Sequence, residues 1–105
     1  MIEASTTLKT EHAGKYLTQL CKHFAHKIDV SYDYDHGECR FMCGTAILDA
    51  AENALSIKAI SPDEEQLQET QSVIERHLVR FAFREEIGPL QWQRRFEPVS
   101  AKGEA

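Results

Sequence analysis

Long apolar runs are absent from this 105-residue sequence, and no stretch approaches the ~20 consecutive apolar residues that a membrane-spanning helix needs. The first residues also differ from a secretory signal peptide. Glu3 stands where such a peptide carries positive charge, and no apolar run follows it. We therefore expect no membrane partner and a cytoplasmic location.

Positive charge is also scarce. The chain has 12 Lys and Arg residues against 17 Asp and Glu residues, and its formal net charge is -5. Non-specific binding to DNA or RNA depends on an excess of Lys and Arg facing the phosphates. We therefore expect no nucleic-acid partner.

Cysteine and glycine are few. The three cysteines are Cys21, Cys39 and Cys43, and an odd number in a chain large enough to bury its own core predicts reduced thiols, which again favours the cytoplasm. The five glycines are scattered, so the sequence holds no glycine-rich phosphate loop. No H-E-x-x-H motif is present either.

What is present is a regular succession of strand-like and helix-like segments. Period-two alternation of apolar and polar side chains, bounded by turn residues, predicts strands. These strands cover residues 4–9, 28–35, 38–43, 46–50 and 55–59, and a further short strand over 90–96 would contain Trp92. In the second of them, Tyr32 and Tyr34 are expected on the buried face and Asp33 on the wet face.

Apolar residues at spacings of three and four predict two helices. The first covers residues 11–27, with Thr10 as its N-cap. The second begins after Ser61, which we expect to cap it together with Glu64 in a capping box. It continues to residues 84–86 and ends before Gly88.

These elements define a fold class. Hairpin-length connections make the central strands antiparallel, and two amphipathic helices need an apolar sheet face to cover. We predict an α+β two-layer sandwich, in which a mostly antiparallel sheet of four to five strands carries two helices on one face. A single α+β domain is expected over residues 4–96, followed by a disordered polar tail over 97–105.

Two longer stretches carry a family resemblance. One runs from Tyr16 to Lys27, and the other runs from His77 to Glu86 and is followed by Trp92 and Gln93. Over roughly residues 5–95 the chain resembles the bacterial domain-of-unknown-function family 2218. The resemblance implies a compact two-layer α/β domain and supplies no catalytic residues. Because domains of this kind occur beside or fused to siderophore-interacting reductases, it also implies an accessory role in iron or siderophore handling.

A cationic cluster between the two helices is the first candidate site. It would use His23, Lys27, His77, Arg80 and Arg84 to bind an anion, since guanidinium groups pair readily with carboxylates and phosphates. A simpler interpretation is that basic residues late in a helix only complement its dipole. In that case the neighbouring acids at positions 85 and 86 would pair with the arginines.

A metal site is the second candidate. His23 and His26 lie one helical turn apart, and His77 in the second helix could add a third ligand. The spacing of His36, Cys39 and Cys43 supplies only one short-spaced pair of zinc ligands, and its cysteines are more typical of small buried hydrophobes. Both groups are expected to be structural, and no cofactor is predicted.

The resulting functional hypothesis is a non-enzymatic domain that binds a small anionic ligand or a protein partner, accessory to iron or siderophore handling. One alternative is a small metal-binding protein or enzyme that uses the histidines His23, His26 and His77. Another is a protein–protein interaction module that works through an exposed sheet face or edge. The chain is expected to be a monomer or a homodimer, and Trp92 could close the core or lie in an interface.

Overall fold

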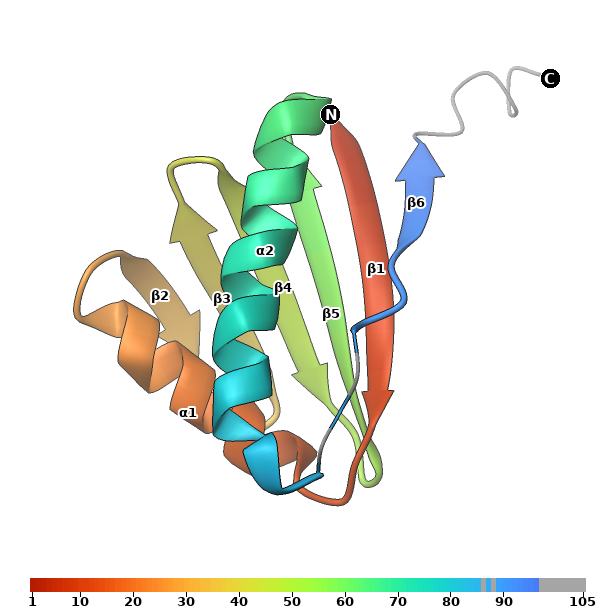
Figure 1. Cartoon of the computed structure of the whole chain (residues 1–105). Coiled ribbons are helices and arrows are strands. Elements are labelled where there is room, and N and C mark those ends of the chain that lie inside the picture. The colour runs from red at the N-terminus through yellow and green to blue at the C-terminus, as the bar shows by residue number, and fades with distance from the viewer. Residues whose placement is uncertain (86, 88, 97–105) are drawn as a thin grey trace, which may run out of the picture.

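The computed structural model describes residues 1–85, 87 and 89–96 (Figure 1). The strands and helices follow one another as β1 (Ile2–Lys9), α1 (Ala13–Ala25), β2 (Asp29–Tyr32), β3 (His36–Phe41), β4 (Gly44–Ala50), β5 (Ala54–Ser61), α2 (Glu64–Phe81), a 3-10 turn (Phe83–Glu85) and β6 (Gln93–Phe96). The strands form one sheet in the order β2-β3-β4-β5-β1-β6, and all neighbouring pairs are antiparallel. Among the described residues, no helix is long and apolar enough to cross a membrane.

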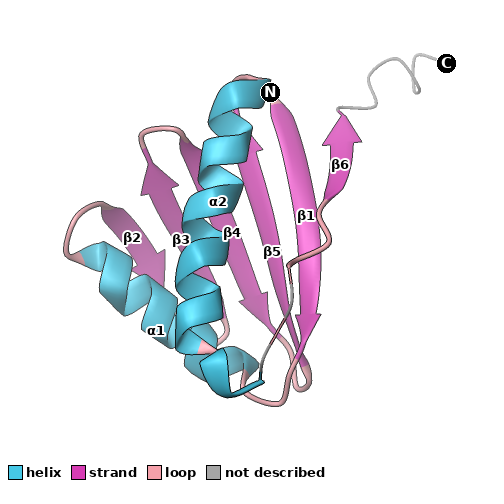
Figure 2. Cartoon of the chain, in the orientation of Figure 1, coloured by secondary structure: helices cyan, strands magenta, loops and turns pink. Residues whose placement is uncertain are grey.

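Both helices cover the same face of the sheet, as Figure 2 shows. Helix α1 contacts β2, β3 and β4, while α2 lies over β4, β5 and β1. Every second residue of a strand points toward the helices. Cys39, Leu48 and Ile57 are therefore buried between the sheet and the helices. The α+β two-layer sandwich predicted from the sequence is therefore confirmed.

The core is built from the apolar stripes that the helix periodicity predicted. Leu17 and Leu20 of α1, together with Ile74 and Leu78 of α2, have no exposed surface. Burying one such side chain contributes roughly 1.5–3 kcal/mol to the free energy of unfolding. This buried layer therefore holds the two helices in fixed positions. These positions decide which side chains on the outer flanks of α1 and α2 come close to one another.

The strand count differs from the predicted four to five. Residues 93–96 pair with residues 2–5 of β1, so β6 forms a sixth strand at the edge of the sheet. Such a segment has little periodicity of its own, and its pairing with the first strand depends on the path of the whole chain. The predicted tail over 97–105 lies outside the described residues.

The helix starts also differ from those predicted. Asp63, not Ser61, is the N-cap of α2, and its side chain accepts a hydrogen bond from the backbone N–H of Gln66 at 2.9 Å. Ser61 is instead the last residue of β5, where its hydroxyl lies 3.0 Å from that of Thr70. Thr10 accepts from the backbone N–H at position 12, and α1 begins only at residue 13. Burial of these hydroxyls in the packed structure overrides their local capping preference.

The turn between β2 and β3 is earlier than the sequence pattern indicated. The carboxylate of Asp33 accepts hydrogen bonds at 3.0 Å from the backbone N–H groups of Asp35 and His36, so β3 starts at His36. Because the chain turns here, Tyr32 and Tyr34 are 40% and 81% exposed, and their predicted place on the buried face is wrong. Of the acidic residues in this part of the chain, Asp33 accepts the hydrogen bonds of the turn, and Asp29 forms a surface ion pair with Arg40.

Candidate functional site

The two helices bring together a pair of histidine rings. His23 of α1 and His77 of α2 have ring centroids 4.7 Å apart, and Phe24 and Phe81 pack edge-on around them. Nδ1 of His77 lies 2.8 Å from the carbonyl oxygen of Val73, and a carbonyl can only accept, so this nitrogen carries the proton.

Positive charge surrounds this histidine pair. Burial lowers the pKa of His23, and the positive charges of His77, Lys27, Arg80 and His26 lower it further. Lys27 and Arg80 are exposed to solvent, whereas the two rings are half-buried. We call His23, Lys27, His77 and Arg80 the cationic cluster.

The acids that could neutralise these cations are engaged elsewhere. Glu75 accepts the indole N–H of Trp92 at 2.9 Å, and Glu85 accepts hydrogen bonds from the hydroxyls of Tyr16 and Thr10. In the part of the chain that the structure describes, neither Lys27 nor Arg80 forms an ion pair. Glu85 therefore contacts Tyr16 and Thr10 and forms no ion pair with a described arginine, while the residue at position 86 lies outside the described residues.

Two of the predicted site residues lie apart from the cluster centre. Arg84 belongs to the 3-10 turn, where its guanidinium lies over the ring of Phe83 at 5.5 Å, and its charge is not among those that act on His23. His26 is exposed at the end of α1. Within the described residues, no group of three or more His, Cys, Asp or Glu side chains is placed to hold a metal ion, so His26 does not complete a ligand set with His23 and His77.

The cysteines and His36 are separated by the sheet. Cys39 faces the helices and interacts with Cys21, and this contact together with burial raises its pKa. His36 lies three residues earlier, on the open face, where Nδ1 is 2.6 Å from the carboxylate of Asp49. The thiol of Cys43 accepts a hydrogen bond from a threonine at 3.2 Å. The spacing of these residues in the sequence therefore does not correspond to a common site.

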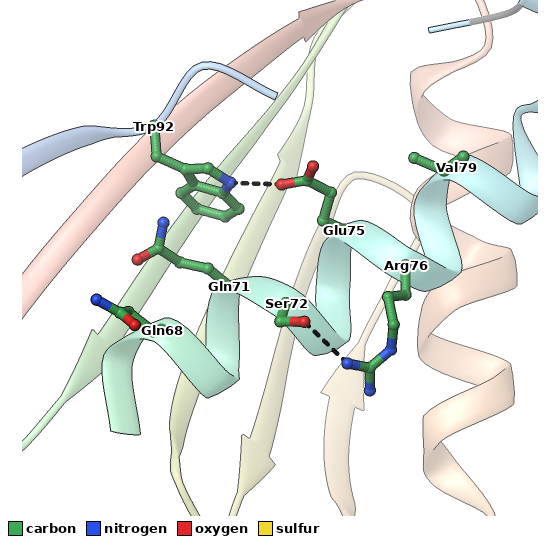
Figure 3. A pocket seen from close by; sticks show the side chains of 7 residues that line it. All are labelled: Gln68, Gln71, Ser72, Glu75, Arg76, Val79 and Trp92. Atoms are coloured by element: carbon green, nitrogen blue, oxygen red, sulfur yellow. Dashed lines mark hydrogen bonds between the residues drawn. The ribbon is translucent and has the colours of Figure 1, made fainter. Parts of the chain in front are cut away.

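A groove on the opposite flank of α2 was not anticipated from the sequence. It has a volume of about 530 Å³ and lies between α2 and the segment that leads into β6 (Figure 3). Its lining comprises Gln68, Gln71, Ser72, Glu75, Arg76, Val79 and Trp92. The single tryptophan was the only signal for it, and the sequence left the role of this residue open.

Some polar groups that line the groove have hydrogen-bond partners and one does not. Trp92 donates to Glu75, and Arg76 donates to the hydroxyl of Ser72 at 2.8 Å. The side-chain oxygen of Gln71, in contrast, is buried and accepts no hydrogen bond. An unsatisfied buried acceptor costs roughly 1–3 kcal/mol.

Comparisons with known proteins agree with this architecture. A family described as an uncharacterized protein conserved in bacteria (DUF2218) matches residues 5–93. The NMR structure of PA4090 from Pseudomonas aeruginosa is similar, with a TM-score of 0.73 and 29% sequence identity over 90% of this chain and 96% of that one. No curated protein matches the chain.

Proposed function

The chain belongs to the DUF2218 family of bacterial proteins, and from that premise we propose that it is a non-enzymatic domain that binds a small anion at the cationic cluster. The proposal rests on one observation, which is that the exposed cations of this cluster have no carboxylate partner among the described residues. Lys27 and Arg80 are exposed beside the His23–His77 pair, and among the described residues no acid pairs with them. A ligand carboxylate or phosphate would supply the absent partner.

Electrostatics support an anion here although the whole chain is acidic. A charge pair about 4 Å apart near a protein surface gains about 4 kcal/mol at an effective dielectric constant of 20, whereas distant charges are screened within about 8–10 Å. The net charge of -5 therefore matters less than the local excess of cations. His23, whose pKa is lowered, would take up a proton as an anion binds, which adds a further positive charge.

A binding role rather than a catalytic one is supported by the state of three side chains that could otherwise react, namely Cys21, Cys39 and Tyr16. Cys21 and Cys39 have no exposed surface, and burial of Tyr16 with its bond to Glu85 raises the pKa of this phenol to about 12. A buried thiol is inert and a phenol of this pKa remains protonated at neutral pH. None of these groups lies ready to attack a bound molecule.

The ligand class that we propose is a ferric siderophore with net negative charge. Its support is the resemblance to domains found beside siderophore-interacting reductases, together with the cationic flank described above. A cytoplasmic location is part of the same proposal, and the three free thiols at Cys21, Cys39 and Cys43 support it, since reducing compartments preserve unpaired cysteines.

The test is a nuclear magnetic resonance titration of the whole protein with inorganic pyrophosphate and, separately, with a ferric tricatecholate complex. We expect amide shifts confined to the last turns of α1 and α2. Lys27→Ala and Arg80→Ala should each weaken the dissociation constant about tenfold, since a charged hydrogen bond contributes about 1.5–3 kcal/mol. The matched control is Lys15→Ala, which removes an exposed lysine from the first turn of α1.

Either of two results would overturn the proposal. If neither probe shifts any amide near the cationic cluster, the cluster is not an anion site. If Lys15→Ala weakens binding as much as Lys27→Ala, the attraction is general and not a site. Shifts with pyrophosphate alone would keep the anion site and reject the siderophore.

A further inference from the structure

Two large apolar side chains are exposed at the end of α2. Val79 is 39% exposed, and Phe83, in the 3-10 turn that continues the helix, is 65% exposed. The guanidinium of Arg84 lies 5.5 Å from the centroid of the Phe83 ring, so it covers only one face of this ring. Single exposed apolar residues are ordinary on a protein surface, whereas apolar residues grouped beside a groove mark an interaction surface.

The groove beside Trp92 lies on the same flank of α2 as Val79 (Figure 3). Its volume of about 530 Å³ can hold an aromatic side chain, and its lining extends along the helix from Gln68 to Val79. Trp92 forms one wall, and the hydrogen bond from its indole N–H to Glu75 at 2.9 Å holds this wall in place. With the N–H satisfied, the surface that the indole turns to the groove is apolar.

A second copy of the chain carries apolar side chains at the spacing that this groove requires. Two copies related by a two-fold axis perpendicular to α2 use the same surface, and their α2 helices run antiparallel. With the axis between positions 75 and 76, residues equally far from it on either side face each other. Phe83 of the second copy then faces Gln68, and Val79 of the second copy faces Ser72. Because Gln68 and Ser72 both line the groove, each copy places its exposed apolar side chains over the groove of the other.

The charges on α2 match under the same symmetry. At the axis, Glu75 of each copy faces Arg76 of the other. Arg76 forms no ion pair within the described residues, and the indole occupies one carboxylate oxygen of Glu75, so each can take a further partner. Exposed acids lie in the first half of the helix and exposed arginines in the second half, namely Glu65, Glu69, Arg76 and Arg80. Antiparallel packing therefore brings the acidic half of one helix beside the basic half of the other.

The size of this contact predicts a weak dimer. An aromatic side chain buries about 150–250 Å², whereas a stable protein–protein interface buries about 1,200–2,000 Å² in total. The two Phe83 rings and the two groove walls that cover them come to the low end of that range or below it. We therefore expect monomer and dimer to exchange, with the dimer favoured as the protein concentration rises.

From these features we propose that the protein forms a two-fold symmetric dimer, in which α2 packs antiparallel against α2 of a second copy and Phe83 of each copy enters the Trp92 groove of the other. The partner of this surface is thus the chain itself. His23 and Lys27 lie on α1 and do not line the groove, so the dimer leaves the cationic cluster open to its ligand.

The experiment is sedimentation velocity of the whole protein over increasing concentration, together with the fluorescence and the indole N–H resonance of Trp92, the single tryptophan of the chain. The sedimenting mass should rise from that of a monomer to that of a dimer. The two Trp92 signals should change over the same range of concentration, because the ring of Phe83 then lies against the indole.

Two substitutions of exposed aromatic residues separate this surface from general stickiness. Phe83→Ala removes one ring from each copy and should weaken the dimer about a hundredfold, at about tenfold or about 1.4 kcal/mol for each ring. Tyr34→Ala is the matched control, because Tyr34 is 81% exposed in the turn before β3 and should dimerise like the wild type. Equal melting temperatures for the two variants check that both are folded.

Three results would overturn the proposal. The protein could remain a monomer at every concentration, Phe83→Ala could dimerise as well as Tyr34→Ala, or a dimer could form without any change at Trp92. Arg76→Glu gives a further test, because it leaves only acids at the axis and should also weaken the dimer. These results are independent of the pyrophosphate titration, because Lys27 and Arg80 do not line the groove.

Discussion

The phenol of Tyr16 donates a hydrogen bond to the carboxylate of Glu85, which lies 69 residues later in the chain. Thr10 donates to the same oxygen at 2.8 Å. Burial first, and then the contact with Glu85, raises the pKa of Tyr16 to about 12, and the hydrogen bond lowers the pKa of Glu85. This contact ties the start of α1 to the 3-10 turn that follows α2 and keeps Glu85 away from the arginines of α2.

Tyr16→Phe should therefore lower the free energy of unfolding. The substitution removes a half-buried hydrogen bond to a charged group, and such a bond contributes about 1.5–3 kcal/mol. Urea denaturation measures the loss. Tyr34→Phe is the matched control, because Tyr34 is 81% exposed and its variant should unfold like the wild type. Equal midpoints for the two variants would show that the contact of Tyr16 with Glu85 adds nothing to stability.

Gly44→Ala should be strongly destabilising. A Cβ at this position would lie 2.1 Å from the Ser61 hydroxyl oxygen and 2.4 Å from the Ile60 carbonyl oxygen. Backbone cannot give way cheaply, and overpacking of this kind costs about 1–3 kcal/mol or more. Thermal unfolding measures the effect. Gly14→Ala is the control, since its Cβ would meet nothing closer than 3.5 Å. Because alanine favours helix, that variant should unfold at or above the wild-type temperature, and a Gly44→Ala protein as stable as this control would contradict the packing seen here.

His36 should titrate above its ordinary range. The hydrogen bonds to Asp49 and Glu38 raise the pKa of His36. A raised folded-state pKa adds stability that is complete below the unfolded value near 6.5 and is lost as the pH rises through the folded value. The side chains of His36 and Asp49 are 45% and 60% exposed, so screening limits the contribution to about 0.2–1 kcal/mol.

The pKa of His36, followed by nuclear magnetic resonance, should fall in Asp49→Asn. Glu52→Gln is the control, because it removes an exposed acid from the turn before β5 and should leave the titration of His36 unchanged. An unchanged His36 curve in Asp49→Asn would mean that the 2.6 Å contact does not persist in solution.

His23 should behave in the opposite way. Because burial and the neighbouring cations lower the pKa of His23, the unfolded chain binds the proton more readily. Stability attributable to His23 is therefore complete above about pH 6.5 and falls as the pH decreases through the folded-state value. Lys27→Ala removes one of the cations and should raise the pKa of His23. As the pH falls below about 6.5, the melting temperature of the wild type should decrease more than that of His23→Gln. Parallel curves for the two proteins would contradict the assignment.

Pyrophosphate should raise the pKa of His23 as well, if it occupies the cationic cluster. A bound anion offsets the charges of Lys27 and Arg80, which disfavour protonation in the free protein. The histidine ring resonances in the presence and absence of pyrophosphate provide the measurement. An unchanged titration in saturating pyrophosphate would place the anion elsewhere.

The fold class followed from local patterns in the sequence. Alternation with a period of two marked the strands, and spacings of three and four marked the buried stripe of α2 with Leu67, Ile74 and Leu78. These patterns are reliable because each records which side of a local element must leave water. The sequence also placed His23 and His77 in one candidate cluster between the two helices, and the structure brings their rings together.

Tertiary structure alone decided the rest. Ser61 has the local chemistry of a helix cap, but burial against Thr70 makes it the end of a strand. The partners of Trp92 and Tyr16 lie 17 and 69 residues away in the sequence. The groove, and the lack of a described acid paired with Lys27 or Arg80, could therefore not be inferred from spacing. Local sequence specifies which side chains are buried, whereas the position of a distant carboxylate depends on how the whole chain packs.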